Sequence, residues 1–340
     1  MCGISGIVAG GDQQKNIEAM CRMLVHRGPE NTSIYRYENV WLGHNRLRII
    51  DIETGDQPIF NEDGSVGVVF NGEIYNFMEI KADLEEKGHT FKTTSDTEIL
   101  VHLYEEKGIE MFDKLNGIFA FAILDKNRNR IILARDHFGV KPLFYYERGG
   151  KLVFGSEAKA ILTHPDVPRK RNDHATHLLA NLRYVQSEQT LFKDIHHVPP
   201  GSYLVHENGK SKVSRYYEFN PEVQDISFED AKDGIQARLK EAVRRQLISD
   251  VPIGAFLSGG IDSSSLVAMM SELGVDDIRT FTLGFNEPTD EFDSAKMIAD
   301  QFSTNHQTLS LDLDPMKHFP NVIWHSEVPK INLLQGHMMS

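Results

Sequence analysis

The pattern of predicted secondary structure changes near residue 220, and this change limits the folds open to the chain. Before it, short strand-like runs bounded by turn residues interleave with helical patterns, which predicts sheets covered by helices. After the polar segment Asn220–Ser227, the expected order is helix, strand, glycine-serine loop, helix, strand, helix, strand. This order is typical of a parallel α/β sheet. Because 340 residues are many for one hydrophobic core, we expect two domains, at residues 2–215 and 225–340.

The expected elements can be given in chain order. The strands of the first domain are Ile4–Val8, Val40–Leu42, Val66–Phe70, Ile118–Leu124, Arg130–Ala134, Leu143–Tyr146 and Leu152–Phe154, and its helices are Asn16–Leu24, Phe77–Glu86 and Asp96–Glu106. The second domain is expected to contain helices Phe228–Leu247, Ser263–Leu273, Glu291–Phe302 and Asn332–Ser340, and strands Val251–Leu257, Thr280–Phe285 and Gln307–Leu311.

Bulk composition excludes several classes of protein. A net charge of −13 argues against a surface that coats nucleic acid or is drawn to anionic lipid. Two cysteines, Cys2 and Cys21, are too few for a disulfide scaffold or a four-cysteine zinc site. No signal peptide is visible, and the longest apolar stretch, around Ile118–Leu124, is far too short to span a bilayer. We therefore expect a cytoplasmic protein with no nucleic-acid or membrane partner.

A cysteine directly follows the initiator methionine. Its small side chain permits removal of Met1, which would leave Cys2 with both a thiol and a free α-amine. An α-amine has a pKa of roughly 7.7–8.0, so an appreciable fraction can accept a proton near neutrality. One residue could then supply nucleophile and base together. Alternatively, the cysteine stands at this position by chance, and the neighbouring sequence has to distinguish the two interpretations.

Three further segments of the first domain carry side chains suited to binding a small polar molecule. Arg46 offers a guanidinium that can bind a carboxylate bidentately. Asn71 and Gly72 follow a strand, so an amide side chain and an unhindered backbone N–H could converge on one oxygen, as an oxyanion hole requires. Asp96 lies in a Ser-Asp-Thr-Glu run with capping-box spacing, so a helix cap is its simplest interpretation. Together with Cys2, these groups describe an amino acid whose side-chain carbonyl is attacked.

The segment from Arg135 to Pro142 is expected to be a structural turn with an internal ion pair. Cys21 lies on an expected helix among apolar neighbours and is predicted to pack in the core. No histidine is singled out as a general base, although His26 and His44 compete for that role. We prefer the α-amine of Cys2 and interpret His26 as structural.

In the second domain, a glycine-serine loop joins a strand to a helix. Glycines let the backbone approach an anion, serines donate hydroxyls, and the helix N-terminus adds partial positive charge. The Walker A pattern is absent, because no Gly-Lys-Ser/Thr closes the loop. The loop runs from Phe256 to Ser264 and reads FLSGGIDSS.

Residues 2–215 resemble the class II, N-terminal-nucleophile glutamine amidotransferase domain. The matching runs are Cys2–Ile4, His26–Pro29, Arg46–Leu47, Phe70–Asn76, Ser95–Glu98, Arg135–Asp136 and Gly139–Leu143. The resemblance implies that Cys2 attacks the glutamine amide while Asn71 and Gly72 hold the oxyanion. It also implies that Arg46 and Asp96 bind the carboxylate and ammonium of glutamine, with Glu73 lining the pocket. Glu30-Asn31 departs from the Asp-Glu usual after Arg-Gly-Pro in relatives, but it lies beside the motif.

The glycine-serine loop resembles the PP-loop of ATP pyrophosphatases, which cleave ATP to AMP and pyrophosphate. By that resemblance Asp262 is a candidate Mg²⁺ ligand, and the ATP-binding residues are Leu257, Ser258, Gly259, Gly260, Asp262, Ser263, Ser264 and Leu283. The combination resembles glutamine-hydrolysing asparagine synthetases. It implies a four-layer αββα N-terminal-nucleophile sandwich followed by a partial parallel α/β PP-loop domain, with L-glutamine, L-aspartate and ATP as substrates and no organic prosthetic group.

Relatives continue beyond Ser340 through a second glycine-acidic motif, so we expect a truncated chain, a fragment or a split polypeptide. A homodimer, and a second chain that supplies the remainder, stay open. Two alternatives to asparagine synthesis also stay open: amidation of another carboxylate acceptor, and a chain that retains only glutaminase activity or a non-catalytic role.

Overall fold

The structure is a computed structural model that describes residues 1–185, 188–285, 288–312 and 315–329. It divides into two compact units. The first comprises Met1–Asn220 and a short segment that begins at Glu327, and the second runs from Pro221 to Ser326. Among the described residues, no helix is both long and apolar enough to cross a membrane.

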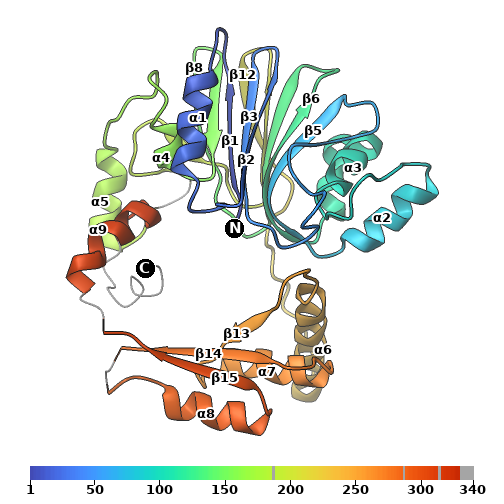
Figure 1. Cartoon of the computed structure of the whole chain (residues 1–340), viewed down its shortest axis with the longest axis vertical. Helices are drawn as coiled ribbons and strands as arrows, with labels where there is room; N and C mark the ends of the chain where they lie inside the picture. Colours follow the sequence, from blue (N-terminus) through green and yellow to red (C-terminus); the bar gives the residue numbers. More distant parts are fainter. Residues whose placement is uncertain (186–187, 286–287, 313–314, 330–340) are drawn as a thin grey trace. The chain divides into compact units, whose positions relative to one another are not determined.

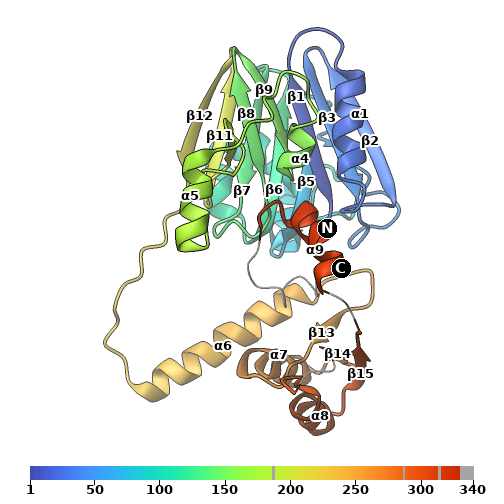
Figure 2. The same cartoon turned by 90° about the vertical axis from the view of Figure 1, so that its left-hand side faces the viewer.

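The first unit contains two six-stranded antiparallel sheets that face each other, with helices on their outer faces (Figures 1 and 2). In spatial order the first sheet is β10 (Ile195–His197), β8 (Phe144–Arg148), β9 (Lys151–Gly155), β1 (Gly3–Val8), β3 (Val40–Arg46) and β2 (Asn31–Tyr37). The second is β12 (Lys210–Arg215), β11 (Ser202–Glu207), β7 (Arg130–Arg135), β6 (Gly117–Asp125), β5 (Val66–Ile74) and β4 (Ile59–Phe60).

Helices cover both outer faces of this pair of sheets. The first sheet is covered by α1 (Gln14–Met23) and α4 (Ala158–Ile161), and the second by α2 (Phe77–Glu86) and α3 (Ile99–Lys107), with the 3₁₀ helix η1 (Gly108–Lys114) following α3 (Figure 1). A further helix, α5, spans Asp173–Leu182. The unit is therefore the four-layer αββα sandwich that the family resemblance implied.

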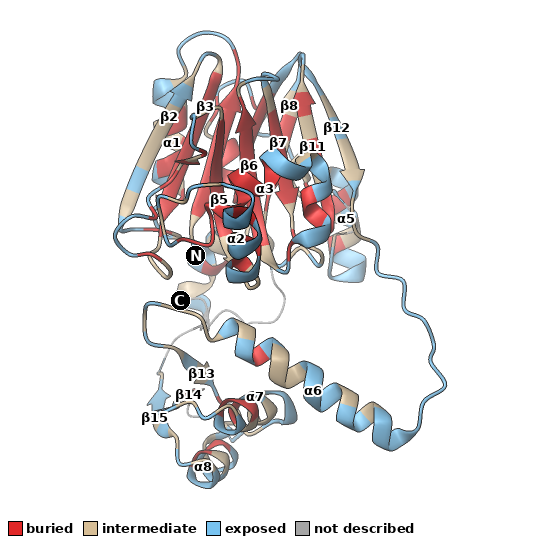
Figure 3. Cartoon of the chain, turned by 90° about the vertical axis from the view of Figure 1, so that its right-hand side faces the viewer, coloured by how far each residue is buried: buried red, intermediate tan, exposed pale blue. Residues whose placement is uncertain are grey.

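The central strands are buried on both faces, as Figure 3 shows in red. Ile4, Val8 and Leu42 belong to the core between the two sheets, while Ile7 and Trp41 belong to the core between the first sheet and its helices. This division follows from the two-residue period of a strand. Even-numbered residues of β1 and β3 therefore face the second sheet. The same alternation determines toward which face the side chains at the ends of these strands point.

The second unit is a three-stranded parallel sheet with helices. Its strands lie in the order β13 (Gly254–Phe256), β14 (Arg279–Gly284) and β15 (Asn305–Ser310), and its helices are α6 (Phe228–Gln246), α7 (Ile261–Glu272), α8 (Phe292–Gln301) and α9 (Pro315–Ser326). Both strand pairs are parallel, as predicted. The helix predicted over Asn332–Ser340 lies outside the described residues.

Two predictions of local structure were wrong. Ser95 and Glu98 do not form a capping box, because Glu98 accepts the backbone N–H groups of Lys92 and Thr93 at 2.8 and 2.7 Å instead. Helix α3 begins only at Ile99. The local spacing fitted a cap, but the preceding loop uses the carboxylate.

The segment from Arg135 to Pro142 forms the predicted turn, but in the described structure hydrogen bonds to the main chain hold it instead of an internal ion pair. Asp136 accepts backbone N–H groups from Phe138, Val140 and Lys141 at 2.9–3.1 Å. The Arg135 guanidinium donates to backbone carbonyls of the turn, including Lys141 at 2.8 Å. Each side chain satisfies main-chain groups that the turn leaves without partners. Cys21 is buried in the core, as predicted.

Candidate active site

Cys2 lies directly before β1, a central strand that is hydrogen-bonded to β3 on one side and β9 on the other. Side chains alternate between the two faces of a strand, and the even-numbered residues of β1 face the second sheet, so we expect the side chain of Cys2 to point toward that sheet. On that sheet Val69 faces the core between the sheets, so Asn71 and Glu73 of β5 face the same way. Strand geometry alone therefore brings Cys2 opposite the Asn-Gly-Glu run.

The thiol and the main chain of Cys2 are held by two neighbours, Leu47 and Arg27. Leu47 donates its N–H to the sulfur at 3.4 Å. The Arg27 guanidinium donates to the carbonyl oxygen of Cys2 at 3.0 Å and pairs with Glu157 at 3.0 Å. His26 also contacts Glu157, at 2.9 Å, which agrees with a structural role. Sequence reasoning did not identify Arg27 or Glu157 as supports of the nucleophile.

Asn71 and Gly72 have the properties expected of an oxyanion hole. The Asn71 side chain is 1% exposed, and neither its Oδ1 nor its Nδ2 has a hydrogen-bond partner within the described structure. A buried unpaired amide is costly, roughly 1–3 kcal/mol, so its persistence points to a ligand. At Gly72 a Cβ would lie 2.2 Å from the Ile118 carbonyl oxygen. Only glycine fits this close approach of β5 to β6.

Two carboxylates, the half-buried Glu73 and the buried Asp96, line the same cavity as the nucleophile. Asp96 accepts the N–H of Ile74 at 2.9 Å and so is tied to β5 rather than capping a helix. Burial raises the pKa of Asp96 to about 6. Burial, followed by repulsion from Asp96, raises the pKa of Glu73 to about 8. A bound cation would relieve both penalties, so the pair suits an ammonium group.

Arg46 projects from the end of β3 into the same cavity. Its Nη1 pairs with Asp56 at 2.5 Å, and its Nη2 donates to the backbone carbonyl of Asp51. Asp56 was not anticipated, and a substrate carboxylate would share the guanidinium with it. Of the predicted glutamine-site residues, the structure brings five around one cavity of about 30 Å³: Cys2, Arg46, Gly72, Glu73 and Asp96. Leu47, Ile49, Ile50 and Gly55 also line it.

Neither candidate histidine is positioned as a base for the thiol. His44 is buried against the Phe70 carbonyl oxygen at 3.2 Å, and burial lowers its pKa to about 4.

Burial raises the pKa of the Cys2 thiol, so the neutral thiol dominates at pH 7. Burial also lowers the pKa of the terminal amine of Met1, with Arg27 and Lys141 lowering it further.

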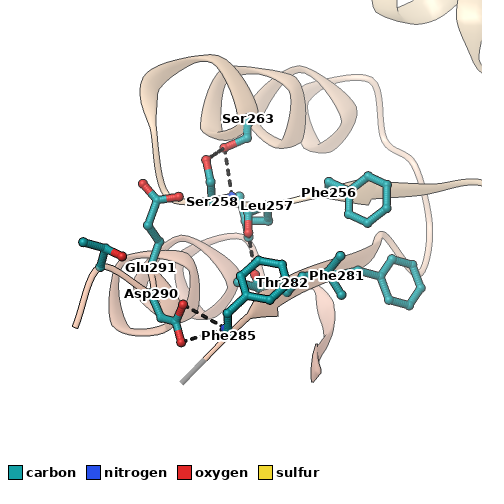
Figure 4. Close-up of a pocket in the computed structure, with 11 residues that line it drawn as sticks. Phe256, Leu257, Ser258, Ser263, Phe281, Thr282, Phe285, Asp290 and Glu291 are labelled. Carbon is teal, nitrogen blue, oxygen red and sulfur yellow. Dashed lines mark hydrogen bonds between the residues drawn. The ribbon is translucent and has the colours of Figure 1, made fainter. Parts of the chain in front are cut away.

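The second unit contains a cavity of about 390 Å³ at the carboxyl ends of β13 and β14 (Figure 4). Four of the predicted ATP-binding residues line it: Leu257, Ser258, Ser263 and Leu283. The cavity also has walls that were not predicted, made by Phe256, Phe281, Thr282, Phe285, Thr289, Asp290 and Glu291. The carboxyl end of a parallel sheet is where α/β proteins bind ligands.

The remaining predicted residues of this site, Gly259, Gly260, Asp262 and Ser264, lie in the loop and the first turn of α7, outside the lining of the cavity. The loop is built for close packing. Gly259 has φ +76°, and a Cβ there would lie 2.5 Å from the Cβ of Ser294. Ser263 Oγ accepts the N–H of Ser258 at 3.1 Å, which closes the turn (Figure 4). The buried hydroxyl of Ser264 has no hydrogen-bond partner in the described part of the chain.

The fold and both sites agree with what the chain is similar to. Residues 1–217 match the glutamine amidotransferase domain family, so the chain belongs to that family. Residues 234–335 match the asparagine synthase family. The pairing of these two domains confirms the resemblance to glutamine-hydrolysing asparagine synthetases noted from the motifs.

Individual relatives extend this picture. Asparagine synthetase [glutamine-hydrolyzing] 3 of Bacillus subtilis (strain 168) is 33% identical over 97% of this chain, which covers 57% of that relative. Amidase chry2 of Gibberella zeae is 32% identical over 97% of this chain and 54% of its own length. The chain thus spans about half the length of these curated relatives.

A solved structure supports the fold alone. The glutamine phosphoribosylpyrophosphate amidotransferase of B. subtilis aligns with a TM-score of 0.50 and 17% identity, covering 92% of this chain and 91% of that one. It agrees with the predicted N-terminal-nucleophile fold class.

Proposed function

We propose that the first unit hydrolyses L-glutamine to L-glutamate and ammonia, with Cys2 as the nucleophile. The observation that carries this proposal is the shared cavity of Cys2, Arg46, Glu73 and Asp96 next to the unpaired amide of Asn71. A thiol, a carboxylate-binding cation, two ammonium-binding carboxylates and an oxyanion donor together fit glutamine. In the proposed complex Arg46 binds the α-carboxylate and Asp96 with Glu73 binds the α-ammonium.

The proposed reaction begins after removal of Met1, when the α-amine of Cys2 takes the thiol proton. The thiolate attacks the carboxamide carbon, and the Asn71 amide and the Gly72 N–H stabilise the oxyanion. The amine then returns the proton to the departing nitrogen, ammonia leaves, and water hydrolyses the thioester to glutamate.

We further propose that the second unit binds ATP and activates L-aspartate as its β-aspartyl adenylate, which ammonia converts to L-asparagine. The apolar walls of Phe256, Phe281 and Phe285 suit an adenine ring, and the N-terminus of α7 suits phosphate. Asp262, an exposed carboxylate at the start of α7, fits the Mg²⁺ preference for one or two carboxylates plus phosphate oxygens. The ion would neutralise polyphosphate charge there. The proposed cellular location of this reaction is the cytoplasm.

Glutamate release from glutamine tests the nucleophile. The parent protein should release glutamate, and Cys2→Ala should release none above background, while Cys21→Ala, a thiol outside the site, should keep the parent rate. Intact mass should show that the active protein begins at Cys2. Equal rates for the parent and Cys2→Ala, or full activity with Met1 retained, would refute the proposal.

A second candidate is amidation of another carboxylate, because the relative from G. zeae is named an amidase rather than an asparagine synthetase. Product mass spectrometry with ¹⁵N-amide glutamine, ATP and a panel of carboxylic acids separates the two. The label should appear in asparagine when aspartate is supplied, together with any chain that supplies further parts of the synthetase site. Label in another amide would select the second candidate.

A further inference from the structure

Four metal-ligating side chains converge beside α3, and none of them lines either cavity described above. They come from three segments of the first unit: Glu62 before β5, His89 after α2, and His102 and Glu105 on α3. One ligand atom from each lies within 4.8 Å of the others. We call these residues the histidine-glutamate cluster, and we propose that it binds a divalent metal ion of the Zn²⁺ class.

The spacing of the cluster is close to that of a tetrahedral centre, and its ligand atoms, within 4.8 Å of one another, would draw together around an ion. Bonds of about 2.0–2.1 Å from zinc to nitrogen or oxygen place neighbouring ligand atoms about 3.3 Å apart. His102 Nδ1 lies 3.2 Å from Glu62 and 3.5 Å from Glu105, and His89 Nδ1 lies 3.4 Å from Glu62 and 3.9 Å from Glu105. Both histidines thus present Nδ1, with a carboxylate oxygen on either side.

The opposite ring nitrogens each face an outer carboxylate. His102 Nε2 lies 3.6 Å from Glu98, and His89 Nε2 contacts Glu106 at 3.3 Å. A metal-binding histidine usually gives its second nitrogen to such a carboxylate, which fixes the tautomer that leaves Nδ1 available. His89 and His102 share this arrangement, with Nδ1 toward the cluster and Nε2 toward an outer carboxylate, which favours a metal site over a chance group of charged side chains.

The carboxylate ligands are also held in place. Asn61 donates to Glu105 Oε1 at 2.7 Å, so Oε2 faces the histidines. The Thr90 N–H donates to Glu62 Oε1 at 2.9 Å, so Oε2 faces His102. The outer groups therefore orient the ligands before any ion arrives.

His102 supplies an independent sign of a ligand. Its side chain is 0% exposed, and neither ring nitrogen makes a hydrogen bond of good geometry within the described structure, although carboxylates of Glu62 and Glu98 lie 3.2 and 3.6 Å from Nδ1 and Nε2. A buried imidazole without hydrogen bonds is unfavourable unless a cation or proton completes its surroundings. Two negative charges from the glutamates would balance a divalent ion, and the side chains of Glu62 and Glu105 are 38% and 30% exposed, which gives the ion a path of entry.

Such an ion would join Glu62, the loop at His89 and helix α3. The same stretch of chain carries Asp96 of the glutamine site between His89 and His102. The ion would thus stabilise the segment that places a substrate-binding carboxylate, without itself touching substrate.

Metal binding can be measured on the full chain without any assay of activity. After dialysis against a chelator, the protein is titrated with Zn²⁺ against a chromophoric competitor, and with Co²⁺ for its visible spectrum. One tightly bound ion per chain, a tetrahedral Co²⁺ spectrum and a higher unfolding temperature with Zn²⁺ are expected. His89→Gln should weaken Zn²⁺ binding more than about 100-fold, and Glu106→Gln about 10–100-fold.

The matched control is His174→Gln, which removes an exposed histidine of α5 and should leave Zn²⁺ affinity unchanged. Circular dichroism checks that each variant folds, and Glu105→Gln replaces His89→Gln if that variant does not. The proposal is overturned if Zn²⁺ binds the parent, His89→Gln and Glu105→Gln equally weakly. An octahedral Co²⁺ spectrum would equally overturn it, leaving an ion-pair network around a protonated His102.

Discussion

Asp96→Asn should make the first unit more stable while it impairs glutamine binding. Asp96 is 4% exposed, and its pKa is raised from 3.8 to about 6 because burial disfavours the charged form. Each unit of pKa corresponds to about 1.4 kcal/mol, so the charged side chain destabilises the fold by up to about 3 kcal/mol. Asparagine keeps an oxygen for the Ile74 N–H but carries no charge. We expect a gain of about 1–3 kcal/mol at pH 8.

The pH dependence follows from the sign of this shift. Below the unfolded pKa near 3.8 the wild-type side chain is neutral in both states and carries no penalty. Between pH 4 and 6 the unfolded chain is ionised while the folded one still holds the proton, so the penalty grows with pH. Above the folded pKa it is constant. The stability advantage of Asp96→Asn should therefore appear between pH 4 and 6 and then level off.

Urea unfolding of parent and variant at pH 4, 6 and 8 measures this difference, with the fluorescence of Trp41, in the first unit, as the probe. The same variant should raise the KM for glutamine at least 30-fold, because losing the buried partner of an ammonium costs about 2–5 kcal/mol. A variant that is less stable than the parent at pH 8 would refute the reasoning about Asp96.

Three further outcomes are expected. Asn71→Ala should lower the kcat of glutamine hydrolysis about 100–1000-fold with little change in KM, since its amide acts only on the oxyanion; a change confined to KM would contradict this. Gly259→Ala should weaken ATP binding measured by calorimetry more than tenfold, because the Cβ would strike Ser294 at a φ of +76°, and glutamine hydrolysis should be unaffected. Glu157→Gln should destabilise the protein by about 3–5 kcal/mol in thermal unfolding, since Arg27 would keep a buried charge without its partner; unchanged stability would show that this ion pair is dispensable.

Sequence patterns predicted those parts of the fold that apolar periodicity encodes. The buried strands β1, β5 and β6 were placed correctly, although β5 and β6 extend beyond their predicted ends. Strand β2 was missed, because its sequence is polar and its burial is only partial. Sheet pairing rather than side-chain pattern holds it in place against β3.

The residues proposed for the glutamine site could be named from the sequence because each carries its chemistry in its own side chain, and the structure brings five of them around one cavity. The residues that hold these groups in place could not be predicted from the sequence. Arg27 and Glu157 are 130 positions apart, and only folding brings them together. The histidine-glutamate cluster was missed for the same reason, since only His102 and Glu105 share a helix face. Glu98 was misassigned because a short local motif fitted a cap, whereas the loop before it competes for the same carboxylate.

The first strand of the chain is anchored between two neighbours, yet the residue that precedes Cys2 remains accessible, with Met1 58% exposed. An aminopeptidase could therefore trim the chain after it has folded. On the proposed mechanism the protein would leave the ribosome as an inert precursor and acquire its base only at that cut. A tag fused ahead of Cys2 would keep it permanently in the precursor form.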